Sequence, residues 1–101
     1  MLPFELTEQA KQDLKEIYRY TITTWSEGQA ERYAARLDEN FFEIANQTAI
    51  VRMFSSLDPE IMVSRCEHHY IFFTHQRGQK PRIFAVLHER MNQLERLKER
   101  L

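Results

Sequence analysis

The chain has 101 residues, of which 43% are hydrophobic, and a formal net charge of −1 at pH 7. A chain of this length holds one core, so we expect a single domain over residues 1–101, and the apolar content excludes intrinsic disorder. Cys66 is the only cysteine, which excludes an internal disulfide and a Cys-x-x-Cys metal motif. The sequence shows no basic-then-apolar leader and no apolar run of about 18 residues, and we therefore expect a cytoplasmic protein without a membrane span.

The charges are distributed unevenly along the chain. Residues 1–50 carry five Lys/Arg and nine Asp/Glu, whereas residues 51–101 carry nine Lys/Arg and six Asp/Glu. The first half therefore has a charge of −4 and the second half a charge of +3. A basic half of this kind can face an acidic partner or a nucleic acid, because charge distribution guides encounter even when the net charge is near zero.

The N-terminal half predicts a short strand followed by two helices. Alternation of Leu2, Phe4 and Leu6 indicates a strand, and Pro3 places it at a sheet edge. Thr7 is a suitable N-cap for a helix with an apolar stripe at helical spacing. That stripe consists of Ala10, Leu14, Ile17, Tyr18, Thr21 and Trp25.

A second helix is predicted to start at Glu27, because Ser26 and Gln29 have the spacing of a capping box. Its apolar stripe consists of Ala30, Tyr33, Ala34, Leu37, Phe41, Ile44 and Ala45. The connection is so short that the helices must form an antiparallel hairpin. We expect Trp25 to cap the end of the hairpin core; the alternative is an exposed side chain that anchors a partner.

The C-terminal half is rich in β-branched and aromatic residues, which predicts three strands at 61–66, 69–75 and 82–88. A tight turn near Glu67 and a second turn containing Gly78 would join them into an antiparallel meander. We expect the N-terminal strand to join its edge and the helical hairpin to cover one face. Residues 46–59 are predicted to form a loop that contains a short extended piece at 50–54.

The tail from Glu89 to Leu101 predicts a short helix with one apolar stripe of Met91, Leu94, Leu97 and Leu101. A helix of this length is marginal in water, so it must pack on the domain, on a second copy or on a partner. The expected fold is α+β, with two layers in the order β-α-α-β-β-β and a short C-terminal helix.

Four segments together resemble the ParE branch of the RelE/ParE toxin superfamily over roughly residues 4–94. They are Ala10–Tyr20 with its Asp13-Leu14 pair, Trp25–Tyr33, Tyr70–Phe73 and Val86–Met91. The resemblance implies a bacterial toxin of a type II toxin–antitoxin system, associated with plasmid stability. ParE-like members inhibit DNA gyrase by direct binding and are neutralised by a ParD-like antitoxin, whereas RelE-like members are ribosome-dependent mRNA endonucleases.

Metal-free RNA cleavage needs a base, an acid and cations that stabilise the phosphate. Arg65, Arg82 and His88 would be that set, but the three predicted strands carry no Lys or Arg besides these two arginines. RNA binding normally requires a larger basic surface. We therefore expect a gyrase inhibitor that needs no catalytic residue or cofactor and does not bind nucleic acid directly; a nuclease and a non-toxic partner-binding scaffold are the alternatives.

The closing motif of the resemblance suggests that His88, Arg90 and Met91 contact the target. Contacts with the antitoxin are expected at Trp25, Tyr70 and Leu94. A simpler interpretation of His88 is a strand-end histidine that hydrogen-bonds a nearby backbone group.

Four histidines, His68, His69, His75 and His88, invite a metal interpretation. His68 and His69 are adjacent and so point to opposite faces of a strand, while His75 and His88 are expected to approach each other across a hairpin. A zinc site needs three or four ligands, and no third ligand is evident. We therefore expect no metal site.

Overall fold

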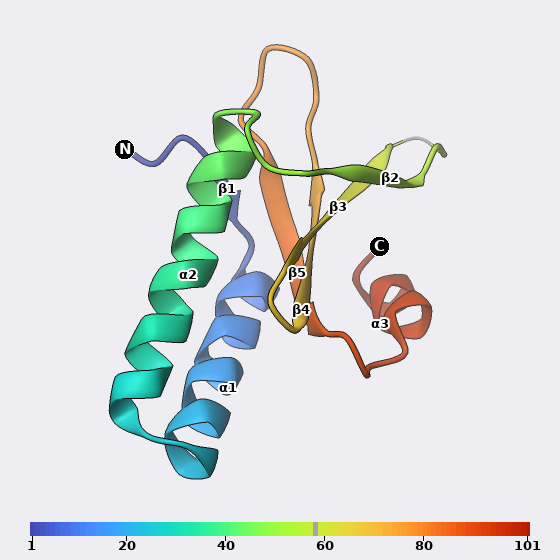
Figure 1. Cartoon of the computed structure of the whole chain (residues 1–101). Coiled ribbons are helices and arrows are strands. Elements are labelled where there is room, and N and C mark those ends of the chain that lie inside the picture. Colours follow the sequence, from blue (N-terminus) through green and yellow to red (C-terminus); the bar gives the residue numbers. More distant parts are fainter. Residues whose placement is uncertain (58) are drawn as a thin grey trace.

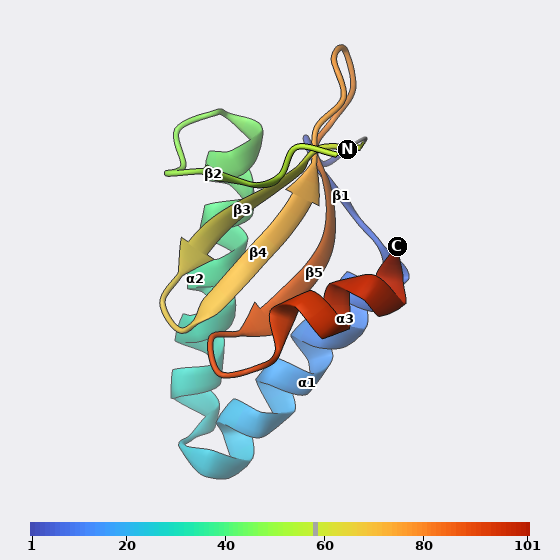
Figure 2. The same cartoon turned by 90° about the vertical axis from the view of Figure 1, so that its right-hand side faces the viewer.

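The fold is built on a five-stranded sheet whose two faces are covered by different helices (Figures 1 and 2). The computed structural model describes residues 1–57 and 59–101. The sheet has the order β1-β5-β4-β3-β2. In chain order the elements are β1 (Glu5–Leu6), α1 (Glu8–Thr24), α2 (Glu27–Ala45), β2 (Arg52–Ser55), β3 (Ile61–Cys66), β4 (His69–Thr74), β5 (Arg82–His88) and α3 (Gln93–Arg100). The α+β class and the predicted element order are confirmed.

The central meander has the predicted strands and turns. Cys66 pairs with His69 across a two-residue turn in which Glu67 has a positive φ of 55°. The second turn contains Gly78 at φ 78°, a conformation that glycine adopts without steric cost. In the pairing of β4 with β5, His69 lies opposite His88. Strand β4 ends at Thr74, one residue earlier than predicted.

The two edges of the sheet are both short strands. Strand β1 pairs with the beginning of β5 in parallel, with Glu5 opposite Arg82, so the sheet is not antiparallel throughout. At the other edge, β2 pairs antiparallel with β3. The extended piece within the predicted loop is therefore a fifth strand, which covers only the first half of β3.

Local capping chemistry explains why the two long helices begin where they do. The Thr7 hydroxyl accepts a hydrogen bond from the N–H of Ala10 at 3.1 Å, and the Ser26 hydroxyl accepts one from the N–H of Gln29 at 3.0 Å. Both predicted helix starts are confirmed. The Gln29 side chain accepts a hydrogen bond from Arg32 at 2.8 Å, on the next turn of the same helix, instead of completing the capping box.

Each face of the sheet carries its own hydrophobic cluster. On one face, side chains of α1 and α2 pack against the sheet, with Ala10, Leu37, Phe41, Ile44, Ile71 and Val86 buried. On the other face, α3 packs against the sheet through Leu97, with Ile61, Val63, Phe72, Phe84, Ala85 and Leu87 buried. The short C-terminal helix thus lies on the side of the sheet opposite the helical hairpin (Figure 2).

Two predictions from the sequence are wrong, namely the start of the tail helix and the packing of Trp25 on the hairpin core. The tail helix begins at Gln93, not Glu89, because Asn92 acts as its N-cap and residues 89–92 form a turn. Leu97 alone of the predicted stripe is buried, whereas Leu94 is 57% exposed. Trp25 is the C-cap of α1 and is 73% exposed, so it does not cap the hairpin core.

Among the described residues, no helix is both long enough and apolar enough to cross a membrane.

Candidate functional site

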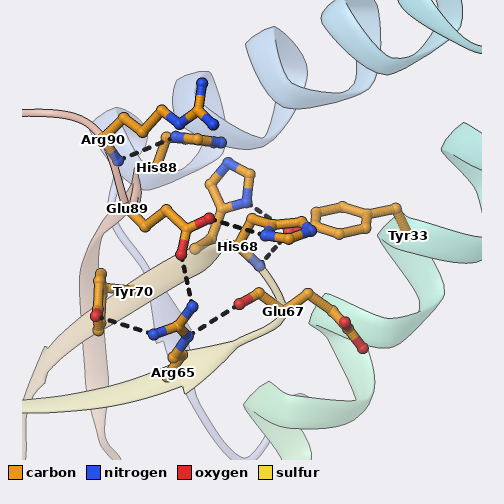
Figure 3. A network of polar contacts seen from close by, with 9 residues as sticks. Tyr33, Arg65, Glu67, His68, Tyr70, His88, Glu89 and Arg90 are labelled. Carbon is orange, nitrogen blue, oxygen red and sulfur yellow. Dashed lines mark hydrogen bonds and ion pairs between the residues drawn. The ribbon is translucent and has the colours of Figure 1, made fainter.

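The candidate site lies where the turn between β3 and β4 meets the end of β5 (Figure 3). Because His69 pairs with His88, the short turn at 67–68 and the turn at 89–91 lie next to each other. Residues of both turns, of the strand ends beside them and of α2 form a network of polar contacts there, which has Tyr33, Arg65, Glu67, His68, His69, Tyr70, His88, Glu89 and Arg90 as members.

Glu89 is the centre of this network. Its carboxylate accepts a hydrogen bond from Arg65 through Oε1 and contacts His68 Nδ1 through Oε2 at 2.9 Å. Its backbone N–H donates to the carbonyl oxygen of His68 at 2.8 Å. The hydrogen bond with His68, followed by the charge of Arg65, lowers the pKa of the Glu89 carboxyl. Glu89 is therefore ionised at neutral pH and holds the two turns together.

Arg65 is held in place by several contacts besides Glu89. Its Nε donates to the carbonyl oxygen of Glu67 at 3.1 Å, and its Nη1 donates to the Tyr70 hydroxyl at 3.3 Å. The guanidinium also lies over the Tyr70 ring, 5.5 Å from the ring centroid. Arg65 thus has several hydrogen-bond partners and a carboxylate that balances its charge.

Tyr33 connects the network to α2. Burial lowers the pKa of His69 to about 4, with further lowering by the charges of His88 and His68, so His69 is neutral at pH 7. Burial also raises the pKa of the Tyr33 hydroxyl, which therefore keeps its proton. That hydroxyl forms a hydrogen bond with His69 Nδ1 at 2.6 Å and accepts one from the backbone N–H of His68 at 3.2 Å. The turn is thereby fixed to the helical hairpin.

The turn after β5 is another exposed part of the site. His88 Nδ1 accepts a hydrogen bond from the backbone N–H of Arg90 at 3.1 Å, which confirms the interpretation of His88 as a strand-end histidine. The N–H of Met91 donates to the carbonyl oxygen of His88 at 3.0 Å. These two bonds fix the backbone of the turn while Arg90 is exposed and Met91 is 41% exposed.

The structure separates the residues of the predicted nuclease set. Arg65 and His88 belong to the same end of the sheet, but Arg82 is the first residue of β5 and His88 is the last. Six residue steps along the strand separate them by about 20 Å. His75 lies at that distant end as well, so the expected approach of His75 to His88 is wrong; His88 lies opposite His69. In the part of the chain that the structure describes, no group of three His, Cys, Asp or Glu is placed to hold a metal.

The predicted antitoxin contacts occupy separate places. Trp25 lies at the corner between α1 and α2, whereas Leu94 is exposed on α3, across the sheet. Tyr70 lies in the cluster on the α3 face and contacts Arg65. Sequence reasoning missed Glu89, His68 and Tyr33. The one signal in the sequence was a carboxylate directly after the last strand. The contact between Tyr33 and His69 left no local signal, because the two residues are 36 positions apart.

Two surfaces are open to a second chain. A narrow groove of about 120 Å³ runs between α1 and α2, and its lining is mostly apolar. Its walls include Leu14, Ile17, Ala30, Tyr33, Ala34 and Phe41. The outer side of β2 is a free sheet edge, and its Met53 and Phe54 are exposed. An edge strand with exposed apolar side chains favours pairing with another chain.

Comparison with known proteins identifies the class of this small α+β protein. Residues 4–93 match the family model described as the ParE toxin of the type II toxin–antitoxin system parDE. The chain therefore belongs to the ParE toxin family of type II toxin–antitoxin systems, as its four sequence segments indicated.

Individual relatives agree with this membership. The chain is 38% identical to "Toxin ParE" of Escherichia coli over 101 residues, which is 100% of the chain and 98% of the relative. It is 29% identical to "Toxin ParE1" of Caulobacter vibrioides over 92 residues, covering 91% of the chain and 94% of the relative. A solved chain from the chromosomal ParDE system of P. aeruginosa matches the structure with a TM-score of 0.70 at 18% identity. The match covers 87% of this chain and 96% of the solved chain, and it supports the fold.

Proposed function

We propose that this toxin inhibits DNA gyrase by direct protein binding, without catalysis, through the turn formed by His88, Arg90 and Met91. The observation that carries the proposal is the state of this turn: its backbone is fixed by hydrogen bonds while the side chains of Arg90 and Met91 face solvent. A preorganised turn with an exposed arginine and methionine loses little conformational entropy on binding, and these residue types are enriched in protein interfaces.

The same geometry ranks the nuclease below the gyrase inhibitor. A phosphate approaching Arg65 would meet Glu89, whose carboxylate is ionised and already paired with that arginine. Arg82 lies about 20 Å from His88 along β5 and cannot share one phosphate with it. The observation in favour of a nuclease is that Arg65, His68 and His88 gather at one end of the sheet, so RNA cleavage remains the second candidate function.

A ParD-like antitoxin is the expected partner, since the solved relative from P. aeruginosa comes from a chromosomal ParDE system. The apolar groove between α1 and α2 suits an apolar side chain from an amphipathic helix, and the edge of β2 suits an added strand. Trp25 lies at the corner of the same helical hairpin, whereas Tyr70 and Leu94 would add contacts on the α3 face of the sheet. A toxin that acts on gyrase and pairs with such an antitoxin works in the cytoplasm.

The mechanism is tested with purified protein in two parallel assays, gyrase supercoiling and integrity of ribosome-bound mRNA. We expect inhibited supercoiling and intact mRNA. The double variant Arg90→Ala/Met91→Ala should lose inhibition, whereas Arg96→Ala on α3 should retain it as a control for the loss of an exposed arginine. Cleaved mRNA with unaffected gyrase, abolished by Arg65→Ala, would establish the nuclease instead.

The antitoxin contact is tested by co-expression with the small ParD-like reading frame expected beside the gene. Isolated toxin should be poorly soluble, because the groove and the β2 edge expose apolar surface. Co-expression should yield a soluble complex. A soluble monomer that is obtained alone and shows no toxicity would identify the chain as a non-toxic scaffold.

A further inference from the structure

A cavity that is separate from the groove between α1 and α2 lies at the end of the sheet opposite the candidate site. A cavity of about 570 Å³ opens between the end of α2, the segment after it, β3 and the turn joining β4 to β5. In Figures 1 and 2 this turn projects beyond the end of the sheet. The apolar part of the lining consists of Ile44, Ala49, Val51, Pro59, Met62 and Phe73. The volume is within the range of about 300–1,000 Å³ that binding pockets occupy.

The rim of this cavity is polar, and its ionisable residues are His75, Arg77 and Glu60. Residues 75–82 contain His75, Arg77, Lys80 and Arg82 but no carboxylate, and His75 and Arg77 line the cavity. Within residues 1–57 and 59–101, the ion pairs do not include any of these cations. Glu60 is the one carboxylate among the described residues that line the cavity. The turn therefore carries the cations Arg77 and Lys80 beside an apolar floor, with Glu60 as the lining carboxylate among the described residues.

We propose that this cavity binds an acidic peptide segment of a protein partner, with an apolar side chain on the floor and carboxylates facing the turn at 75–82. The apolar floor fits an aliphatic anchor, and exposed cations within about 10 Å of one another attract carboxylates through a shared field. Nucleic acid fits less well, because Phe73, the aromatic residue of the lining, is buried and offers no surface on which a base can stack.

This surface is independent of the proposed gyrase contact. Strand β5 begins at Arg82, beside the basic turn, and ends at His88, in the candidate site. The two sites are thus about 20 Å apart and can be occupied together. Failure of peptide binding would leave the gyrase proposal unaffected, and failure to inhibit gyrase would leave the peptide proposal unaffected.

The test uses the full chain and a fluorescein-labelled, terminally blocked peptide Asp-Glu-Leu-Asp-Glu, with binding followed by fluorescence anisotropy. The double variant Arg77→Glu/Lys80→Glu should weaken binding about tenfold. Glu60→Gln should strengthen it, because a repelling carboxylate is removed. The charge-matched control Lys15→Glu/Arg19→Glu changes two exposed cations of α1 and should leave the affinity unchanged. Circular dichroism verifies that each variant is folded.

Several results would overturn the proposal. Equal weakening by the Lys15→Glu/Arg19→Glu control would show non-specific attraction, and equal binding of a peptide with serine in place of leucine would show that the cavity floor is not used. A short DNA duplex that competes more strongly than unlabelled peptide would assign the surface to nucleic acid. Absence of saturable binding to the unaltered chain would also reject it.

Discussion

Arg100 and Asp13 form a bidentate ion pair that joins α3 to α1 across 87 positions of sequence. Arg100 Nη2 donates to Asp13 Oδ1 at 2.7 Å, and Nη1 donates to Oδ2. The pair also completes the edge of β5 beyond the two residues that β1 covers: Nη1 donates to the carbonyl oxygen of Phe84 at 3.0 Å, and the N–H of Val86 donates to Asp13 Oδ2 at 2.9 Å. Side chains thus satisfy backbone groups that a longer strand would otherwise pair.

Removal of the Arg100 side chain should be strongly destabilising. Arg100→Ala leaves the buried Asp13 carboxylate without its counter-charge, and we expect the free energy of unfolding to fall by about 2–3 kcal/mol. Arg96→Ala, an exposed position of the same helix, should change it by less than about 0.5 kcal/mol. Urea unfolding of the two variants measures the difference. Equal effects at Arg96 and Arg100 would contradict the ion pair.

The tail helix should depend on one leucine. Leu97 is 1% exposed and belongs to the cluster that contains Phe84 and Leu87, so Leu97→Ala should lower the free energy of unfolding by about 2–4 kcal/mol. Leu94→Ala removes the same atoms from an exposed position and should cost less than about 0.5 kcal/mol. Thermal unfolding of both variants tests this. A chain without residues 92–101 should be destabilised by a comparable or larger amount, because it lacks both Leu97 and Arg100.

Protonation of His69 should make the fold sensitive to mild acid. The pKa of His69 is about 4 in the folded protein and about 6.5 in the unfolded chain, so the unfolded chain binds the proton first as pH falls. Stability is therefore full above pH 6.5 and decreases below it, by about 2 kcal/mol between pH 7.5 and pH 5. Urea unfolding at several pH values measures this loss. His69→Gln should remove most of it, and an unchanged pH profile would show that another group is responsible.

Trp25 should matter for binding and not for folding. Its side chain is exposed at the corner of the helical hairpin, so Trp25→Ala should change the free energy of unfolding by less than about 0.5 kcal/mol. If the antitoxin contacts this corner, affinity for the antitoxin should fall by tenfold or more, as is common for an interfacial tryptophan. Calorimetric titration with the antitoxin measures it. The control is Tyr20→Ala, which removes an exposed aromatic side chain from α1. It shows whether the loss of antitoxin affinity is confined to Trp25.

The sequence by itself determined the elements whose causes are local. Helix starts follow from a hydroxyl that accepts a backbone N–H three residues later, as at Thr7 and Ser26. The strands at 61–66 and 82–88 follow from β-branched and aromatic residues between turns, and Gly78 supplies the positive φ that its turn requires. These signals act over a few residues, so they can be read without knowing where the rest of the chain lies.

The tertiary structure alone decided which distant residues meet. The parallel pairing of β1, the exposure of Trp25 and Leu94, and the link from Glu89 to Arg65 and His68 depend on how helices and strands dock. Each charged or aromatic side chain could pair with many other residues of suitable chemistry in the sequence. Only the packed core, which places the end of β5 beside the turn after β3, selects one of them.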